Sequence, residues 1–425
     1  MNGGLIYLAL MVVIAVLLWI KRDKIKIEPI LYIPSKYGIE CELRKKDDKG
    51  EYKPYKKKVI PILFIVLYKT KIGIKFIDRL LYKKIYSNVL KKTLKWMGYI
   101  SIGVCFLTAI AMIGALIYFL WLKFSAPELV PTAGVMFVLP FKIKGQIYVP
   151  FLYWIISVFI IATVHEFGHA IIARLNNVPI DYTGPAFLSL LIPLVPAAFV
   201  LPNEKVMKKT SKGKQLSIIA VGPFFNILLG VICGIVLLLF FIPMTNGFLD
   251  YQGLEITEIE NKDLEGIKIG EVITSLRHEA SESFIANYPV RTRADLYSAL
   301  SELNPGEIIS ICAKDDCYPA VLKQHPTDPE SSYIGVSLIE KTGINDASIE
   351  KYGKVYPLSM LWLKGLFMWL ALLNIGVGVF NALPLGPIDG GQLVHISLKN
   401  KKYGKAIFVG LSMLLLALLV LSMVK

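Results

Sequence analysis

Long runs of apolar residues alternate with shorter polar stretches along this chain of 425 residues. A helix needs about 20 apolar residues to cross the roughly 30 Å of hydrocarbon in a bilayer. Runs of that length, or nearly so, predict six spanning helices, near residues 3–20, 97–122, 150–173, 215–242, 357–380 and 404–424. The pattern therefore predicts a polytopic α-helical membrane protein.

Two further apolar stretches, 131–150 and 183–202, are interrupted by prolines, four of them in the second stretch. Non-helical backbone can lie at membrane depth only where protein or a water-filled cavity satisfies its polar groups. We therefore expect neither stretch to be a spanning helix.

The polar block 243–353, between the fourth and fifth predicted spans, has a different pattern. Short strand-like runs surround a helical segment near 294–303, with turn residues such as Pro305-Gly306 between them. The strand-like runs are Leu254–Ile259, Val272–Leu276, Ile308–Ile311 and Ala320–Leu322. We expect a small folded α+β domain here.

The composition agrees with a membrane protein, because 55% of the residues are hydrophobic and only 19% are charged, against about 25% charged in soluble domains. The net charge of +15 could suggest a nucleic-acid partner. However, the segment 21–95 alone holds 22 Lys and Arg against 8 Asp and Glu. Basic residues beside spans mark the cytoplasmic side, so we expect 21–95 to be cytoplasmic and expect no nucleic-acid partner.

The block 243–353 has the opposite charge, with 19 acidic and 9 basic residues. Alternation of the predicted spans also places it outside the cytoplasm. Cys312 and Cys317 lie close together in this block, and two cysteines in an oxidising compartment can form a disulfide.

The third predicted span contains the sequence His165-Glu166-Phe167-Gly168-His169. Positions i and i+4 share one face of a helix, so the two imidazoles can bind one Zn²⁺ while Glu166 lies beside an open coordination position. An ionisable residue inside a span costs at least about 2.5 kcal/mol and is a functional hypothesis by default. The motif therefore predicts a metal site.

Two histidines leave a catalytic zinc site one protein ligand short. Asp389 follows the fifth predicted span, where Pro384 and Gly386 interrupt the helix, and its carboxylate could turn towards the histidines. From composition alone, an aspartate in water at a helix end is the simpler interpretation.

The HExxH motif, followed far downstream by Asn381-x-x-Pro-x-x-x-x-Asp389-Gly, resembles the site-2 proteases, the zinc intramembrane metalloproteases. The resemblance extends over roughly 130–425. It implies that His165, His169 and Asp389 bind zinc, and that Glu166 is the general base for a zinc-bound water that attacks the scissile carbonyl. The implied activity is hydrolysis of peptide bonds within or near transmembrane segments, known as regulated intramembrane proteolysis.

Other segments match the same family. Gly222-Pro223-Phe224-Phe225-Asn226 resembles its GPxxN motif, 180–203 its re-entrant β-loop, and 253–322 its PDZ insert. The resemblance implies a transmembrane protein substrate and a peptide or C-terminus as ligand of the PDZ-like domain. Asn226 and Asn381 could orient the substrate or polarise the oxyanion, although polar contacts between helices explain them equally well.

A transmembrane substrate must be unwound before hydrolysis, and a strand edge within 183–201 could hold it extended by β-augmentation. We expect four regions: a two-span region 1–122 with the basic block 21–95, a first half of the catalytic membrane core at 123–242, a PDZ-like domain at 243–353, and a second half of the core at 354–425.

Two alternative functions remain open. One is an inactive membrane scaffold with a PDZ-like domain, in which a structural metal joins two spans. The other is a zinc peptidase of another family with a Glu as third ligand, but downstream of His169 the only Glu near the spans is Glu204, in a Lys-rich loop. In each case we expect an integral membrane protein in the plasma membrane of a prokaryote, in contact with the lipid bilayer.

Overall fold

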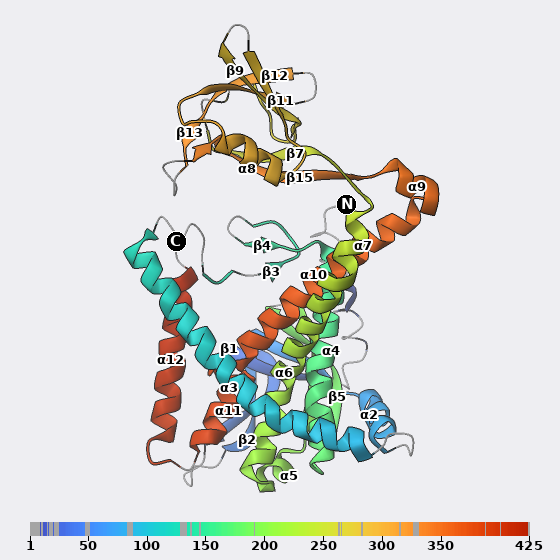
Figure 1. The fold of residues 1–425 in the computed structure, drawn as a ribbon. Coiled ribbons are helices and arrows are strands. Elements are labelled where there is room, and N and C mark those ends of the chain that lie inside the picture. The colour runs from blue at the N-terminus through green and yellow to red at the C-terminus, as the bar shows by residue number, and fades with distance from the viewer. Residues whose placement is uncertain are drawn as a thin grey trace. The chain divides into compact units, whose positions relative to one another are not determined.

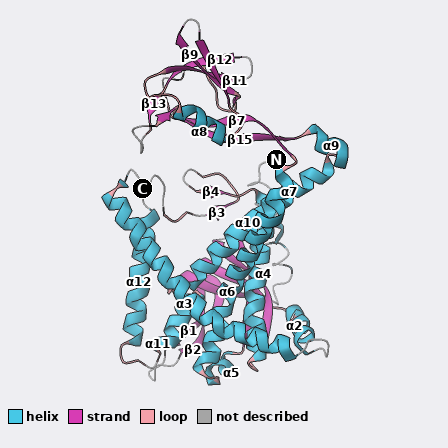
Figure 2. Cartoon of the chain, viewed as in Figure 1, coloured by secondary structure: helices cyan, strands magenta, loops and turns pink. Residues whose placement is uncertain are grey.

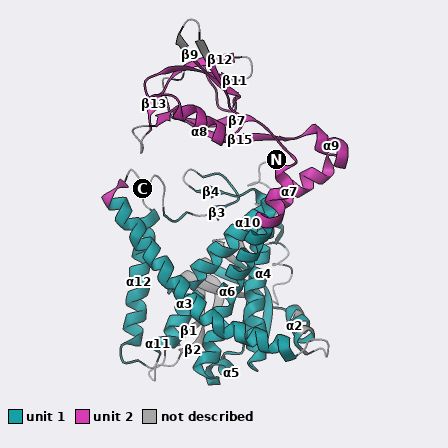
Figure 3. Cartoon of the chain, viewed as in Figure 1, with its two compact units in different colours: residues 1–124, 132–236, 365–425 teal, residues 125–131, 237–364 magenta. Residues whose placement is uncertain are grey.

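The fold is taken from a computed structural model (Figure 1). The structure describes residues 25–46, 52–82, 88–127, 134–136, 138–143, 146–190, 192–261, 264, 266–281, 284–313, 316–325, 331–386, 388–399 and 401–423, with positions 9, 12–14, 16 and 20. It divides into two compact units, which are coloured separately in Figure 3.

Within the described residues, five helices are long and apolar enough to span a membrane. They are α3 (Asn88–Ser125), α4 (Phe151–Leu175), α6 (Lys212–Val236, continued by η3, Leu237–Phe241, and α7, Ile242–Asn246), α10 (Val355–Ala382) and α12 (Gly404–Met423). They coincide with the last five predicted spans, and α3 begins earlier than expected. The first predicted span, 3–20, lies mostly outside the described residues.

A four-stranded antiparallel sheet accompanies these helices in the first unit (Figure 2). Its order is β1 (Ile25–Lys46), β2 (Tyr52–Tyr68), β5 (Ile180–Leu190) and β6 (Ile192–Pro202). The proline-interrupted segment 183–202 therefore forms part of a β-hairpin. The basic block, whose fold the sequence did not predict, forms a second hairpin from β1 and β2. This hairpin joins the sheet because β2 pairs with β5, from Phe64–Ser189 to Leu67–Ala186.

The basic block also supplies α2 (Ile72–Tyr82), which packs on α4. Ile77 and Leu81 are buried in one cluster with Ile172 of α4, and the Arg174 Nε of α4 donates to Asp78 Oδ1 at 2.7 Å. An apolar stripe at helical spacing and a charged contact on its border are typical of an amphipathic helix. The N-terminal region thus packs against the helix that carries HExxH.

Helix α3 packs closely on two other helices of the first unit. Cys105 of α3 is buried in a cluster with Ala220 of α6 and Leu393 of α11 (Asp389–Leu398). The Cys105 Sγ lies 3.2 Å from the Ala220 carbonyl oxygen. Although the family resemblance begins only near residue 130, the structure makes α3 part of the same hydrophobic packing.

The second unit comprises Ser125–Pro131 and Leu237–Lys364. Its strands form a sheet of order β10-β9-β11-β12, a sheet of order β15-β7-β8, and the pair β13-β14. The strands are β7 (Leu249–Ile259), β8 (Val272–Ile273), β9 (Ser275–Ser281), β10 (Phe284–Pro289), β11 (Ile308–Ala313), β12 (Asp316–Val321), β13 (Lys323–Gln324), β14 (Ser332–Tyr333) and β15 (Val336–Ile344). The helices are α8 (Arg293–Ser301) and α9 (Asp346–Tyr352).

This unit has its own core, which includes fully buried Leu254, Ile273, Leu276 and Ile311. The predicted strand-like runs and the predicted helix all correspond to observed elements, so the expected α+β character is present. Cys312 and Cys317 face each other across the β11–β12 hairpin and form a disulfide. Short elements complete the fold: β3 (Val138–Leu139) pairs with β4 (Ile147–Tyr148), and α5 (Glu204–Lys209) follows the β5–β6 hairpin.

Candidate metal centre

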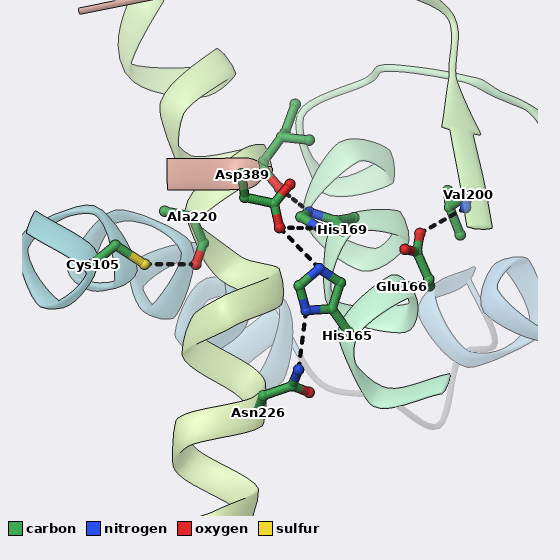
Figure 4. Close-up of polar contacts among 9 residues, drawn as sticks. Cys105, His165, Glu166, His169, Val200, Ala220, Asn226 and Asp389 are labelled. Atoms are coloured by element: carbon green, nitrogen blue, oxygen red, sulfur yellow. Dashed lines mark hydrogen bonds and ion pairs between the residues drawn. The ribbon is translucent and has the colours of Figure 1, made fainter. Parts of the chain in front are cut away.

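His165 and His169 lie one turn apart on α4 and point to the same side of the helix (Figure 4). Their ring centroids are 4.8 Å apart. The helix is continuous here because residues 151–175 contain no proline after its start at Pro150. The i, i+4 spacing thus produces the pair of imidazoles that the sequence predicted.

Asp389 is the first residue of α11 and points at both histidines. Its Oδ2 lies 2.9 Å from Nε2 of His165 and 3.5 Å from Nε2 of His169. A carboxylate at a helix N-terminus also interacts favourably with the helix dipole. The aspartate is therefore not a solvated helix-end residue, and among the described residues it joins the two histidines in a group that could hold a metal ion.

The glycines after Asp389 explain how the chain turns back so tightly. Gly390 packs on the backbone of Ala382, and Gly391 packs on the backbone of Leu385, with no room for a Cβ at either position. The chain can therefore leave α10 at Ala382 and begin α11 at Asp389 in a short turn. Local close packing places the carboxylate opposite α4.

Three observations test whether these residues fit a metal. The donor atoms of His165, His169 and Asp389 all lie within 4.8 Å of one another. Gly222 on α6 faces this point, and a Cβ there would lie 2.8 Å from Nε2 of His165. Two imidazole nitrogens and one carboxylate oxygen are a donor set found in catalytic zinc sites. The cluster fits a zinc site, and Gly222 leaves space beside it.

The outer nitrogen of each imidazole has a polar partner. His169 Nδ1 lies 2.7 Å from the Ile218 carbonyl oxygen, which can only accept, so Nδ1 carries a proton. In the neutral ring this leaves the lone pair on Nε2, the nitrogen that faces Asp389. His165 Nδ1 lies 3.1 Å from Asn226 Nδ2, whereas Asn226 Oδ1 is buried and has no partner among the described residues. Turning the amide by 180° lets His165 Nδ1–H donate to Asn226 Oδ1 and gives that buried oxygen a partner.

Glu166 lies outside the donor group, on a neighbouring face of α4. The Val200 backbone N–H of β6 donates to Glu166 Oε2 at 2.7 Å, as Figure 4 shows. This contact leaves the second carboxylate oxygen, Oε1, for another partner. The structure therefore separates a glutamate beside the cluster from the three residues that form it.

The two predicted asparagines occupy different places. Asn381 is half-buried in the last turn of α10, and Asn226 contacts a histidine ring. Gly222 and Val200 were not singled out as site residues. The GPxxN motif contains Gly222 and could have indicated it, but Val200 takes part through its backbone, for which a sequence has no signal.

Comparison with known proteins adds an independent result. A family model described as Peptidase family M50 matches residues 153–422, which is more than half of the chain. A predicted zinc metalloprotease from Clostridium acetobutylicum is 22% identical over 332 residues, covering 62% of this chain and 93% of that protein. The matched family range includes α4 with HExxH, the GPxxN segment of α6, and Asp389.

Proposed function

The chain belongs to peptidase family M50, and from this premise we propose that it is an intramembrane metalloendopeptidase that cuts within or near transmembrane segments of other proteins. Membership makes it an integral membrane protease with zinc as cofactor. The observation that carries the finer proposal is the meeting of His165, His169 and Asp389, from α4 and α11, with Glu166 left outside the donor group.

We assign the three donors to zinc and Glu166 to proton transfer. When bound, zinc supplies a Lewis acid that polarises a carbonyl and makes a water molecule acidic enough to react near neutral pH. His165 and His169 offer neutral imidazoles, and Asp389 offers one negative charge. A site closed by a fourth protein ligand would be structural, whereas three protein ligands leave a position for the reaction.

Glu166 is suited to move the proton. Its Oε2 is held by the Val200 N–H, which fixes the carboxylate and leaves Oε1 to accept a proton from the attacking water. The same oxygen can then protonate the leaving amine, which is how a general base completes peptide hydrolysis. Asn381, half-buried at the end of α10, is our candidate for orienting the substrate backbone or the oxyanion.

Asn226 supports the site in a different way from the one the sequence suggested. Its side-chain amide contacts His165 Nδ1 at 3.1 Å, so we propose that it orients this ring rather than the substrate. An outer partner that fixes the tautomer and angle of a ligating histidine is common in zinc sites.

The substrate must reach this site in an extended form, because a helix keeps its carbonyls in i to i−4 hydrogen bonds. β6 is an outer strand of the four-stranded sheet and touches Glu166 through Val200. We propose that an unwound substrate segment adds to β6 by β-augmentation.

We propose that the second unit is a PDZ-like domain outside the cytoplasm that binds a peptide or C-terminus. Its acidic character and its Cys312–Cys317 disulfide support an oxidising compartment. From the same charge pattern we propose that the basic block 21–95 is cytoplasmic. We also propose the four-region division of the chain and a location in the plasma membrane of a prokaryote.

The rival function, an inactive scaffold with a structural metal, is disfavoured by the open donor set. One experiment separates the two, namely zinc content and cleavage of a membrane reporter by detergent-purified protein. Glu166→Gln should keep about one zinc per chain and lose cleavage, whereas Asp389→Ala should lose zinc. The exposed Glu204→Gln, in α5, serves as a carboxylate control that should change neither.

Wild-type protein without zinc, or zinc content indifferent to Asp389, would refute the ligand assignment. Wild-type zinc binding without cleavage of any membrane reporter, and a Glu166→Gln variant indistinguishable from it, would favour the scaffold.

A further inference from the structure

The outer edge of β6 is the part of the sheet that faces the candidate site. β5 pairs with β6 on one side, from Ile180–Pro202 to Leu190–Ile192, and β6 ends the strand order of this sheet. Backbone groups that point away from β5 therefore form a free edge. Their positions can be deduced from the register.

Thr183 of β5 fixes which backbone groups of β6 point outwards. Both its N–H and its C=O bond to Thr70, at 3.0 and 2.8 Å, on the side away from β6. Val200 is directly opposite Thr183 in the register. In an antiparallel pair, opposite residues either exchange both hydrogen bonds or both point outwards, so the Val200 backbone points away from β5.

Two contacts agree with this deduction. The Val200 N–H reaches Glu166 Oε2 at 2.7 Å, which is possible only if it points away from β5. The Asn203 N–H, at a position of the opposite parity, points inwards and donates to the Pro179 carbonyl at 2.8 Å.

The period of two along a strand then gives the other outward positions, which are Pro196, Ala198 and Pro202. Proline has no N–H, and prolines within sheets are confined to places where the missing donor would face a free edge. Between Pro196 and Pro202, outward N–H groups therefore come from Ala198 and Val200. Since the Val200 N–H is bonded to Glu166, Ala198 is left as the single outward donor.

We propose that the β6 edge divides two tasks between these amides. The Val200 N–H positions Glu166, and the Ala198 N–H pairs with one backbone carbonyl of the extended substrate. This inference rests on the proposed function and adds to it a fixed substrate register. Residues 198 and 200 are roughly 6.6 Å apart along a strand, so the bond that is cut lies at a constant, short distance in sequence from the residue paired with Ala198.

The register also implies a requirement on the substrate. In an antiparallel pairing with β6, a substrate residue opposite Ala198 both accepts from the Ala198 N–H and donates to the Ala198 C=O. A proline at that substrate position removes the donor. The neighbouring edge positions of β6 offer no other amide to the substrate, because Pro196 has no N–H and the Val200 N–H is bonded to Glu166. The enzyme should therefore be intolerant of proline at one substrate position upstream or downstream of the cut.

The test uses the full-length protein and a reporter with one transmembrane segment, with KM, kcat and zinc content measured for each variant. Ala198→Pro removes the amide assigned to the substrate, so KM should rise about tenfold, as for loss of one hydrogen bond, with kcat nearly kept. Val200→Pro removes the amide assigned to Glu166, so kcat should fall about tenfold or more with KM nearly kept.

Zinc content should stay at the wild-type level in both variants, which shows that the site is intact. The conservative variants Ala198→Gly and Val200→Ala keep their N–H groups and should recover most of each loss. If Ala198→Pro has the wild-type KM, or Val200→Pro the wild-type kcat, the division of tasks is wrong. Absence of cleavage by the wild-type protein would instead count against the proposed function.

A second measurement does not depend on folding of the variants. Proline is placed at each position around the cut in the reporter and wild-type enzyme is used throughout, with cut sites identified by mass spectrometry. The register is supported if proline blocks cleavage at one position away from the cut. That position should keep the same spacing from the cut when the segment is shifted along the reporter. Sensitivity spread evenly over the segment would overturn it.

Discussion

Gly222 faces the Nε2 atom of His165 so closely that a Cβ at this position would lie 2.8 Å from that nitrogen. The two residues come from different helices, α6 and α4. A glycine here lets α6 approach the histidines and still leaves space for an ion between them and Asp389.

We predict that Gly222→Ala weakens zinc binding by about 5- to 150-fold, because the added methyl group overpacks the site by the 1–3 kcal/mol usual for such insertions. Zinc retention during dialysis against graded chelator would measure it. Gly234→Ala on the same helix is the matched control, since a Cβ there would lie 3.9 Å from its nearest neighbour, the Ala371 Cβ. Equal zinc retention in the two variants would contradict the role of Gly222.

Replacement of Asn226 should also weaken zinc binding. Asn226→Leu removes the partner of His165 Nδ1, and loss of such an outer partner typically costs about 10–100-fold in metal affinity. Asn374→Leu is the control, because this buried asparagine donates to Leu370 of its own helix. A competition titration with a zinc indicator would show the difference, and an Asn226→Leu variant with wild-type affinity would refute the orienting role.

The Cys312–Cys317 disulfide gives a test of topology in intact cells. If the second unit is outside the cytoplasm, a membrane-impermeant maleimide should label the chain only after treatment with an impermeant reductant. The experiment uses a Cys41→Ser background, which removes the one other cysteine of the chain besides Cys105 and Cys233. Labelling should disappear in the Cys312→Ser/Cys317→Ser variant of that background, since Cys105 and Cys233 are buried. Labelling that appears only after cell lysis would place this unit inside.

The start of α8 should lose stability in acid. Thr292 and Arg291 backbone N–H groups donate to the Asp295 carboxylate and keep its pKa below the ordinary value. A lowered pKa in the folded state means that the contribution is complete above the unfolded value of about 3.9 and is lost as pH falls below it.

Hydrogen exchange of the amides of 291–301 in the full-length protein would measure this, expressed as protection factors between pH 6 and pH 3. Protection should fall towards pH 3 in the wild type and vary much less in Asp295→Asn, which cannot ionise. The capping box formed by Thr292 and Asp295 would be ruled out as the cause if both proteins showed the same pH dependence.

Much of this architecture follows from local sequence pattern. Apolar length determines the last five spans, since a span is an almost purely compositional feature. The spacing of His165 and His169 fixes their common face, because helix geometry relates i and i+4 whatever surrounds them. The alternation of short strand-like runs and turns likewise predicted the elements of the second unit.

Other features depended on contacts between distant segments. The basic block mixes Lys with Ile, Leu and Tyr, and its β1–β2 hairpin pairs with β5. The periodicity of residues within the block does not reveal this pairing, because β5 is far away in the sequence. Asp389 became a ligand candidate from the residues and from the family resemblance. Its distance of 2.9 Å from His165 results from the packing of α11 against α6 and from glycines that allow a tight turn.

The sequence by itself therefore determined the membrane class, the spans and the donor types, because these depend on composition and on regular spacing along one helix. Only the tertiary structure decided that Asn226 contacts His165, that Gly222 leaves room for an ion, and that the Val200 backbone holds Glu166. These relationships arise where segments far apart in the chain meet, and two of them involve a backbone amide or a missing side chain, which leave no pattern in a sequence.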